Sequence, residues 1–196
     1  MSIYRVIYIP GLGDHRSRGQ ELAVQLWRIY GVKSEMVRMH WRDGKPFAPK
    51  LEALLHKIDS YVAQGDTVSL VAASAGASVA LAAFAARPQQ IQSIALICGK
   101  VLNPQNMHPS VFRNNVSFKD SLGMVNASLS RLTVQDRGRI MRIHPLADES
   151  VPVRDTYIEG AQERTIAVVG HAIAIGYGIT VYAPLMIRFL KRVQQA

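Results

Sequence analysis

Three polar residues of this 196-residue chain have the side-chain types needed for acyl-transfer chemistry. Ser74 lies between two apolar runs, Asp148 follows a later apolar run, and His171 follows the last one before the C-terminal segment. A serine hydroxyl is a weak nucleophile near neutral pH unless an imidazole takes its proton, and a carboxylate can orient that imidazole. The three residues therefore predict a nucleophilic serine if the fold brings them together.

The residues around Ser74 are small. Ala72 precedes it by two positions and Gly76 follows it by two, which gives the pattern Ala-x-Ser-x-Gly. A sharp turn from a strand into a helix leaves little room for β-carbons and exposes the residue at its corner. The same pattern arises by chance in alanine-rich helices, where the serine packs or caps the helix. Its position between a strand pattern and a helix pattern favours the nucleophile, with its backbone in the left-handed region.

Other titratable residues compete for the same roles. His40 and His144 also lie near predicted strand ends, and the chain contains six histidines. Glu149 and Asp155 are further carboxylates, the second in a predicted helix, and either is compatible with a surface position and no role. The histidine at 171 is preferred because it follows both the last predicted strand and a glycine.

The elements that must position these residues alternate between strand and helix patterns. Strands are predicted over 3–10, 32–40, 67–73, 93–98, 139–143 and 164–169. Helices are predicted over 18–30, 49–64, 75–86 and 179–194, with another beginning within 152–159. Residues 99–132 are expected to form loops with one or two short helices around 119–131. This alternation predicts a mostly or wholly parallel sheet of about six strands with helices on both faces, whose sites form at the carboxyl ends of strands.

The composition predicts one globular domain, 1–196, with 48% hydrophobic and 19% charged residues. The net charge of +9 arises from scattered basic residues, and no nucleic-acid-binding motif occurs, so no nucleic-acid partner is expected.

Residues 165–187 lack Asp, Glu, Lys and Arg but contain three glycines and a proline, so we expect a strand, a loop and a helix and no transmembrane segment. Neither a signal-peptide cleavage site nor a P-loop, complete dinucleotide fingerprint or zinc motif is found, which predicts a cytoplasmic protein without cofactor or metal.

Several of these segments resemble the α/β-hydrolase superfamily, and the resemblance spans nearly the whole chain. The segment AASAG resembles the nucleophile elbow of that family, with Ala72 where the first glycine usually stands. ADESVP resembles its acid loop and VVGH its histidine loop, and the chain order Ser, Asp, His is the order of its triad. The chain is most similar to small, uncapped members, because the early antiparallel strands of larger members are missing.

This resemblance implies a three-layer α/β-hydrolase fold and a serine hydrolase of the carboxylesterase, lipase or thioesterase type. Ser74 would be the nucleophile, His171 the general base and Asp148 the acid that orients the base; the alternative acid position, in the loop 99–105, holds no carboxylate. The backbone N–H groups of Leu12 and Ala75 would form the oxyanion hole. The substrate would be a small-molecule ester or thioester.

The sequence leaves the substrate and the oligomeric state undetermined. Apolar residues within 99–132 either line an acyl site or pack on the sheet: Met107, Val111, Phe112, Leu122, Met124, Val125, Leu129 and Leu132. An inactive scaffold that binds another protein is the alternative function, and three intact triad residues argue against it. A peripheral membrane lipase is a third hypothesis, which the basic charge favours.

Overall fold

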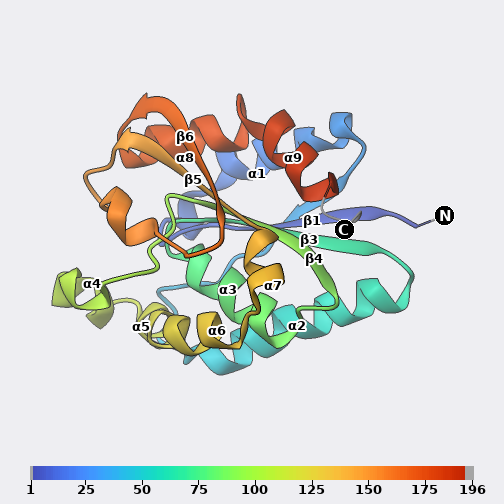
Figure 1. The fold of residues 1–196 in the computed structure, drawn as a ribbon. Coiled ribbons are helices and arrows are strands. Elements are labelled where there is room, and N and C mark those ends of the chain that lie inside the picture. The colour runs from blue at the N-terminus through green and yellow to red at the C-terminus, as the bar shows by residue number, and fades with distance from the viewer. Residues whose placement is uncertain (1, 193–196) are drawn as a thin grey trace.

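A computed structural model describes residues 2–192 and places six strands in one sheet with the order β2-β1-β3-β4-β5-β6 (Figure 1). All five pairs of neighbouring strands are parallel, which confirms the predicted parallel sheet. The strands are β1 (Tyr4–Ile9), β2 (Lys33–Met36), β3 (Thr67–Ala73), β4 (Ile91–Ile97), β5 (Ile140–Ala147) and β6 (Gln162–Val169).

Helices cover both faces of this sheet, as the predicted three layers require (Figure 1). One face is covered by α2 (Phe47–Ala63), α3 (Gly76–Ala86), α5 (Val116–Gly123) and α6 (Val125–Arg131), and the other by α1 (Arg18–Gln25), α8 (His171–Ile179) and α9 (Ala183–Arg192). Two short helices, α4 (Pro109–Arg113) and α7 (Val134–Gly138), lie in the connections.

Alternate residues of the central strand β3 fill the two cores. Leu70 and Ala72 pack with α2 and α3, whereas Val71 and Ala73 pack with α1, α8 and α9. A strand whose side chains are apolar on both faces belongs in the middle of a parallel sheet. The carboxyl end of β3, where Ser74 follows, is therefore held from both sides.

The structure differs from the sequence prediction in several segments, and β5 continues to Ala147, beyond its predicted end at residue 143. β2 ends at Met36, not at residue 40, and the segment 99–132 contains three α-helices rather than one or two. The predicted helix in 152–159 is a single 3-10 turn, Val153–Thr156. The predicted loop after β6 is instead the helix α8, followed by the separate helix α9. Gly176 and Gly178 weaken the helical pattern of α8, and its burial against the sheet compensates for them.

Within the described residues, no single helix is long and apolar enough to cross a membrane. The helices α8 and α9 would meet that test only as a pair, and they are bent by 63° at their junction.

Candidate active site

Ser74 occupies a strained corner between β3 and α3. Its φ is +52°, in the left-handed region that the small neighbours predict, and its N–H donates to the carbonyl of Ile97 at 2.9 Å. A β-carbon at Gly76 would lie 2.4 Å from the carbonyl oxygen of Ile9, and one at Gly11 would lie 2.9 Å from Cβ of Ser74. The corner therefore requires glycine at both positions. With glycine there, the loop after β1 packs directly against Ser74.

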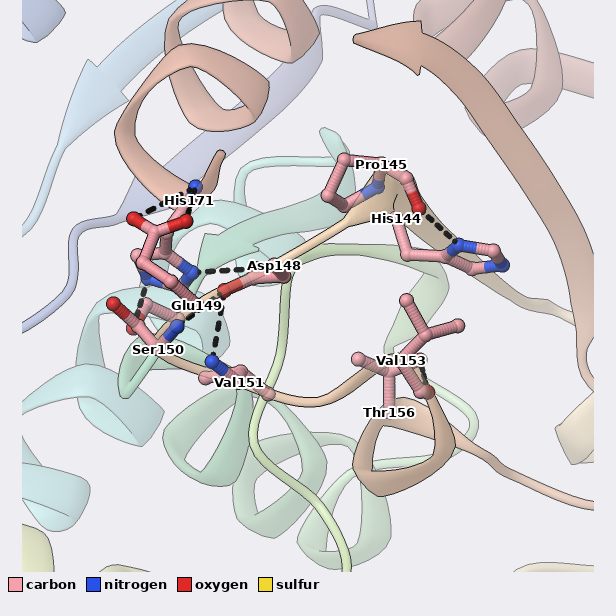
Figure 2. Close-up of polar contacts among 10 residues, drawn as sticks. His144, Pro145, Asp148, Glu149, Ser150, Val151, Val153, Thr156 and His171 are labelled. Carbon is pink, nitrogen blue, oxygen red and sulfur yellow. Dashed lines mark hydrogen bonds and ion pairs between the residues drawn. The ribbon is translucent and has the colours of Figure 1, made fainter. Parts of the chain in front are cut away.

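The three residues singled out in the sequence form one hydrogen-bonded chain. Ser74 Oγ lies 2.9 Å from His171 Nε2. Figure 2 shows the other contact, in which His171 Nδ1 lies 2.7 Å from Asp148 Oδ2. When Nδ1–H donates to the carboxylate, Nε2 is left unprotonated and can accept the serine O–H. The Asp148 side chain is 1% exposed and the His171 side chain 14%, so water reaches the imidazole only at its edge.

The loop after β5 holds Asp148 in place (Figure 2). Its Oδ1 accepts the backbone N–H groups of Ser150 and Val151, both at 2.8 Å, and this leaves Oδ2 for the imidazole. The neighbouring Glu149 carboxylate accepts the backbone N–H of His171 at 3.0 Å. Glu149 thus places a negative charge at the N-terminus of α8, where the helix dipole favours it.

The two rival histidines lie elsewhere. His144 points away from His171 (Figure 2), and its Nε2 lies 2.6 Å from the Glu163 carboxylate. Hydrogen bonding to His144 outweighs burial and, with the charge of Arg142, holds the pKa of Glu163 below its usual range. His40 is exposed, with a φ of +49°, and donates its N–H to Asp14. Neither histidine lines the cavity beside Ser74.

A cavity of about 460 Å³ opens beside Ser74 and His171. Its walls include Leu12 and Ala75, whose N–H groups donate no hydrogen bond to any described residue. Of the apolar residues expected around the site, Met107 and Val111 line the cavity, and Phe118 joins them. The others pack on the core or, like Met124, face solvent.

A buried ion pair beneath this cavity was not found from the sequence. Lys100 lines the cavity, and its Nζ lies 2.5 Å from Oδ2 of Asp155, with the side chains 2% and 0% exposed. The sequence predicted Asp155 in a helix, where a surface position was possible. The structure instead places it in a 3-10 turn with its side chain buried. Its backbone oxygen accepts the N–H groups of Val101 and Leu102, each at 2.9 Å. The turn after the acid loop is thereby fastened to the segment that borders the cavity.

Cys98 is the other buried group beside the acid. It directly follows β4 with a φ of +51°, and its sulfur lies within 4.8 Å of ligand atoms of Asp148 and His171. Burial, together with the charges of Asp148 and Glu149, raises the pKa of the Cys98 thiol above its usual value. The other two groups of this trio are already paired with each other, with His171 Nδ1 2.7 Å from Asp148 Oδ2.

No protein-family model matches this sequence, and no curated protein matches it. Solved structures do match it over nearly their whole length. They include Est1E from Butyrivibrio proteoclasticus (TM-score 0.70, 13% identity, 97% of this chain and 90% of that one). A second is the α/β-hydrolase MGS-MChE2 from the metagenome of Mar Chica lagoon sediments (0.68, 15%, 97% and 91%). A third is a thioesterase domain from the curacin biosynthetic pathway (0.64, 12%, 95% and 91%). The chain therefore has the α/β-hydrolase fold.

Proposed function

We propose that this protein is a serine hydrolase that cleaves an ester or thioester through an acyl-enzyme intermediate. The observation that carries the proposal is the unbroken hydrogen-bonded chain Ser74–His171–Asp148, which begins at a strained corner and faces a cavity. A packing serine has no need of a left-handed backbone, which costs about 1–3 kcal/mol and concentrates at functional sites.

The geometry suggests the order of proton transfers. His171 Nε2 takes the hydroxyl proton while Ser74 Oγ bonds to the carbonyl carbon of the substrate, whose oxygen becomes an oxyanion. The N–H groups of Leu12 and Ala75 are proposed to hold that oxyanion, and Asp148 to stabilise the imidazolium. The imidazolium then gives its proton to the departing alcohol or thiol. Water, deprotonated by the same imidazole, releases the acid and restores the serine.

The cavity lining favours an apolar acyl group. Met107, Val111, Phe118 and Ile175 contribute apolar walls to the cavity that also includes Ser74. The fold neighbours include both a thioesterase domain and metagenome-derived lipolytic enzymes, so the leaving group can be an alcohol or a thiol. A volume of about 460 Å³ falls within the range of about 300–1,000 Å³ that is usual for small-molecule sites.

A fluorophosphonate probe and a series of acyl esters and thioesters test the proposal. Ser74→Ala and His171→Ala are each expected to lower turnover by a factor on the order of 10⁴ and to abolish labelling, because the residues act as a unit. Asp148→Asn is expected to lose less while its melting temperature stays near that of wild type. Ser130→Ala, an exposed serine on α6, serves as the matched control and is expected to be fully active.

Equal labelling of the wild-type protein and Ser74→Ala would contradict the proposal. The protein would then be an α/β-hydrolase scaffold that binds another protein. Two further expectations from the sequence stay predictions: that the chain is one domain, and that it acts in the cytoplasm.

A further inference from the structure

A second, larger cavity lies at the opposite end of the sheet from Ser74. It has a volume of about 680 Å³ and lies between α9 and the amino ends of β5 and β6. Its described lining residues are Gln135, Gly138, Arg139, Met141, Gln162, Arg164, Tyr182, Leu185, Arg188, Phe189 and Arg192. Four of them are arginines and none is an acid. We call this cavity the arginine groove.

One face of α9 forms the long wall of the arginine groove. Leu185, Arg188, Phe189 and Arg192 are spaced i, i+3, i+4 and i+7, so they form a single stripe along the helix. The two arginines are one turn apart, and like charges at that spacing repel each other. An anion between them would replace this repulsion by attraction.

Three of the four guanidinium groups have no counter-charge among the residues that the structure describes. Arg139 is occupied, because it pairs with Asp136 and donates to the carbonyls of Pro88 and Ile91. Arg164 donates only to neutral oxygens on its own strand. Within residues 2–192, no ion pair includes Arg164, Arg188 or Arg192. The arginine groove is therefore a site of uncompensated positive charge.

Basic residues in the last turns of a helix are common, since they interact favourably with the helix dipole. A purely solvated basic face, however, does not require apolar residues beside the charges. Here Leu185 is 54% exposed in the same groove, and Met141 and Phe189 form a buried apolar floor. Cationic and apolar groups thus share one concave surface.

We propose that the arginine groove binds a small amphiphile with an anionic head group, and that a phosphate monoester is the best match. Planar guanidinium groups bind phosphate through paired N–H···O hydrogen bonds, and Arg188 and Arg192 stand about 6 Å apart along the helix axis. The head group lies between these two residues and Arg164. The apolar part runs along α9 towards Leu185 and Tyr182.

Calorimetric titration with dodecyl phosphate, below its micelle-forming concentration, tests this site. Arg188→Gln/Arg192→Gln is expected to weaken binding at least tenfold. Arg28→Gln/Arg131→Gln removes the same charge from two exposed arginines outside the groove and is expected to bind like wild type. Leu185→Ala is expected to weaken dodecyl phosphate but not inorganic phosphate, since only the former has an apolar part.

Equal losses in the two double variants would overturn the proposal, because binding would then follow net charge. Absence of binding to wild type would overturn it as well. Cosedimentation with phosphatidylcholine vesicles containing phosphatidate separates two sources of the head group. If the wild-type protein pellets with the vesicles and only Arg188→Gln/Arg192→Gln fails to do so, the head group belongs to a membrane lipid. If dodecyl phosphate binds in the titration but the protein does not pellet, the head group belongs to a free ligand. Neither result depends on Ser74, so the site and the proposed hydrolysis fail or stand separately.

Discussion

Replacing Asp155 with asparagine removes the counter-charge of an ammonium group that has almost no contact with water. Lys100 Nζ lies 2.5 Å from one carboxylate oxygen, and Asn103 Nδ2 lies 2.6 Å from the other. Burial by itself raises the pKa of Asp155, but the hydrogen bonds from Lys100 and Asn103 outweigh it and hold the pKa below its usual range. The Asp155 carboxyl is therefore ionised at neutral pH, and the variant leaves Lys100 Nζ buried without its carboxylate partner.

The expected loss of stability is large. Removing one partner of a buried ion pair costs about 3–5 kcal/mol. For a chain of this size each kcal/mol lowers the melting temperature by roughly 2–4 °C, so Asp155→Asn is expected to melt about 6–20 °C below wild type. The pair Asp59–Arg87 is the matched control, because its side chains are 33% and 36% exposed. Asp59→Asn is expected to cost about 0–1 kcal/mol.

Thermal melting and urea unfolding, both followed by circular dichroism, measure these differences. The double variant Lys100→Met/Asp155→Asn removes both charges and keeps similar volumes, so it is expected to regain much of the stability that Asp155→Asn loses. The reasoning is refuted if Asp155→Asn loses no more stability than Asp59→Asn. It is also refuted if the double variant is as unstable as the sum of its two single changes, which would mean that the two groups are not coupled.

Three further predictions concern a clash, a titration and a thiol. Gly76→Ala is expected to cost about 1–3 kcal/mol of stability and most of the esterase activity, because its β-carbon would meet the carbonyl of Ile9 at the end of β1. Gly176→Ala, with open space around it, is expected to gain about 0.5–1 kcal/mol, and melting and ester hydrolysis compare the two variants. Because the pKa of Asp155 is lower in the folded state than in the unfolded state, its contribution to the free energy of unfolding is complete above about pH 4 and is lost as the pH falls further. In unfolding measured down to pH 2, the stability of the wild type is therefore expected to approach that of Asp155→Asn. Because Cys98 is buried and protonated, its thiol is expected not to react with Ellman's reagent at pH 8 in the native protein and to react fully in guanidinium. A reaction in the native protein would contradict the burial of this thiol.

The corner at Ser74 could be predicted from the sequence because the small residues that permit it lie beside it in the chain, although the contact that requires Gly76 comes from Ile9. Its left-handed backbone needs small neighbours, and Ala72 and Gly76 are visible in the sequence as the change from a strand pattern to a helix pattern. The parallel sheet could be predicted for a related reason. Strands buried on both faces are continuous apolar runs, and their alternation with helices restricts the possible topologies.

The helix α8 shows where local patterns fail. Its N-cap, Gly170, has a φ of +100°, and two more glycines follow within the helix, so the segment has the composition of a loop. Packing of Ala174, Ile175 and Ile179 against the sheet stabilises it as a helix. That packing also places His171 in the first turn, within reach of Ser74.

The sequence by itself determined six strands in their order along the chain, the small residues at the Ser74 corner and the residue types available at the strand ends, because each can be read from neighbours along the chain. Only the tertiary structure decided that Asp155 is the buried partner of Lys100, and that α9 and two strand ends enclose an arginine groove. These features join residues distant in the sequence, such as Arg139 and Arg188. Ion pairs and cavities depend on distances between segments, and those distances are set by how the helices pack on the sheet.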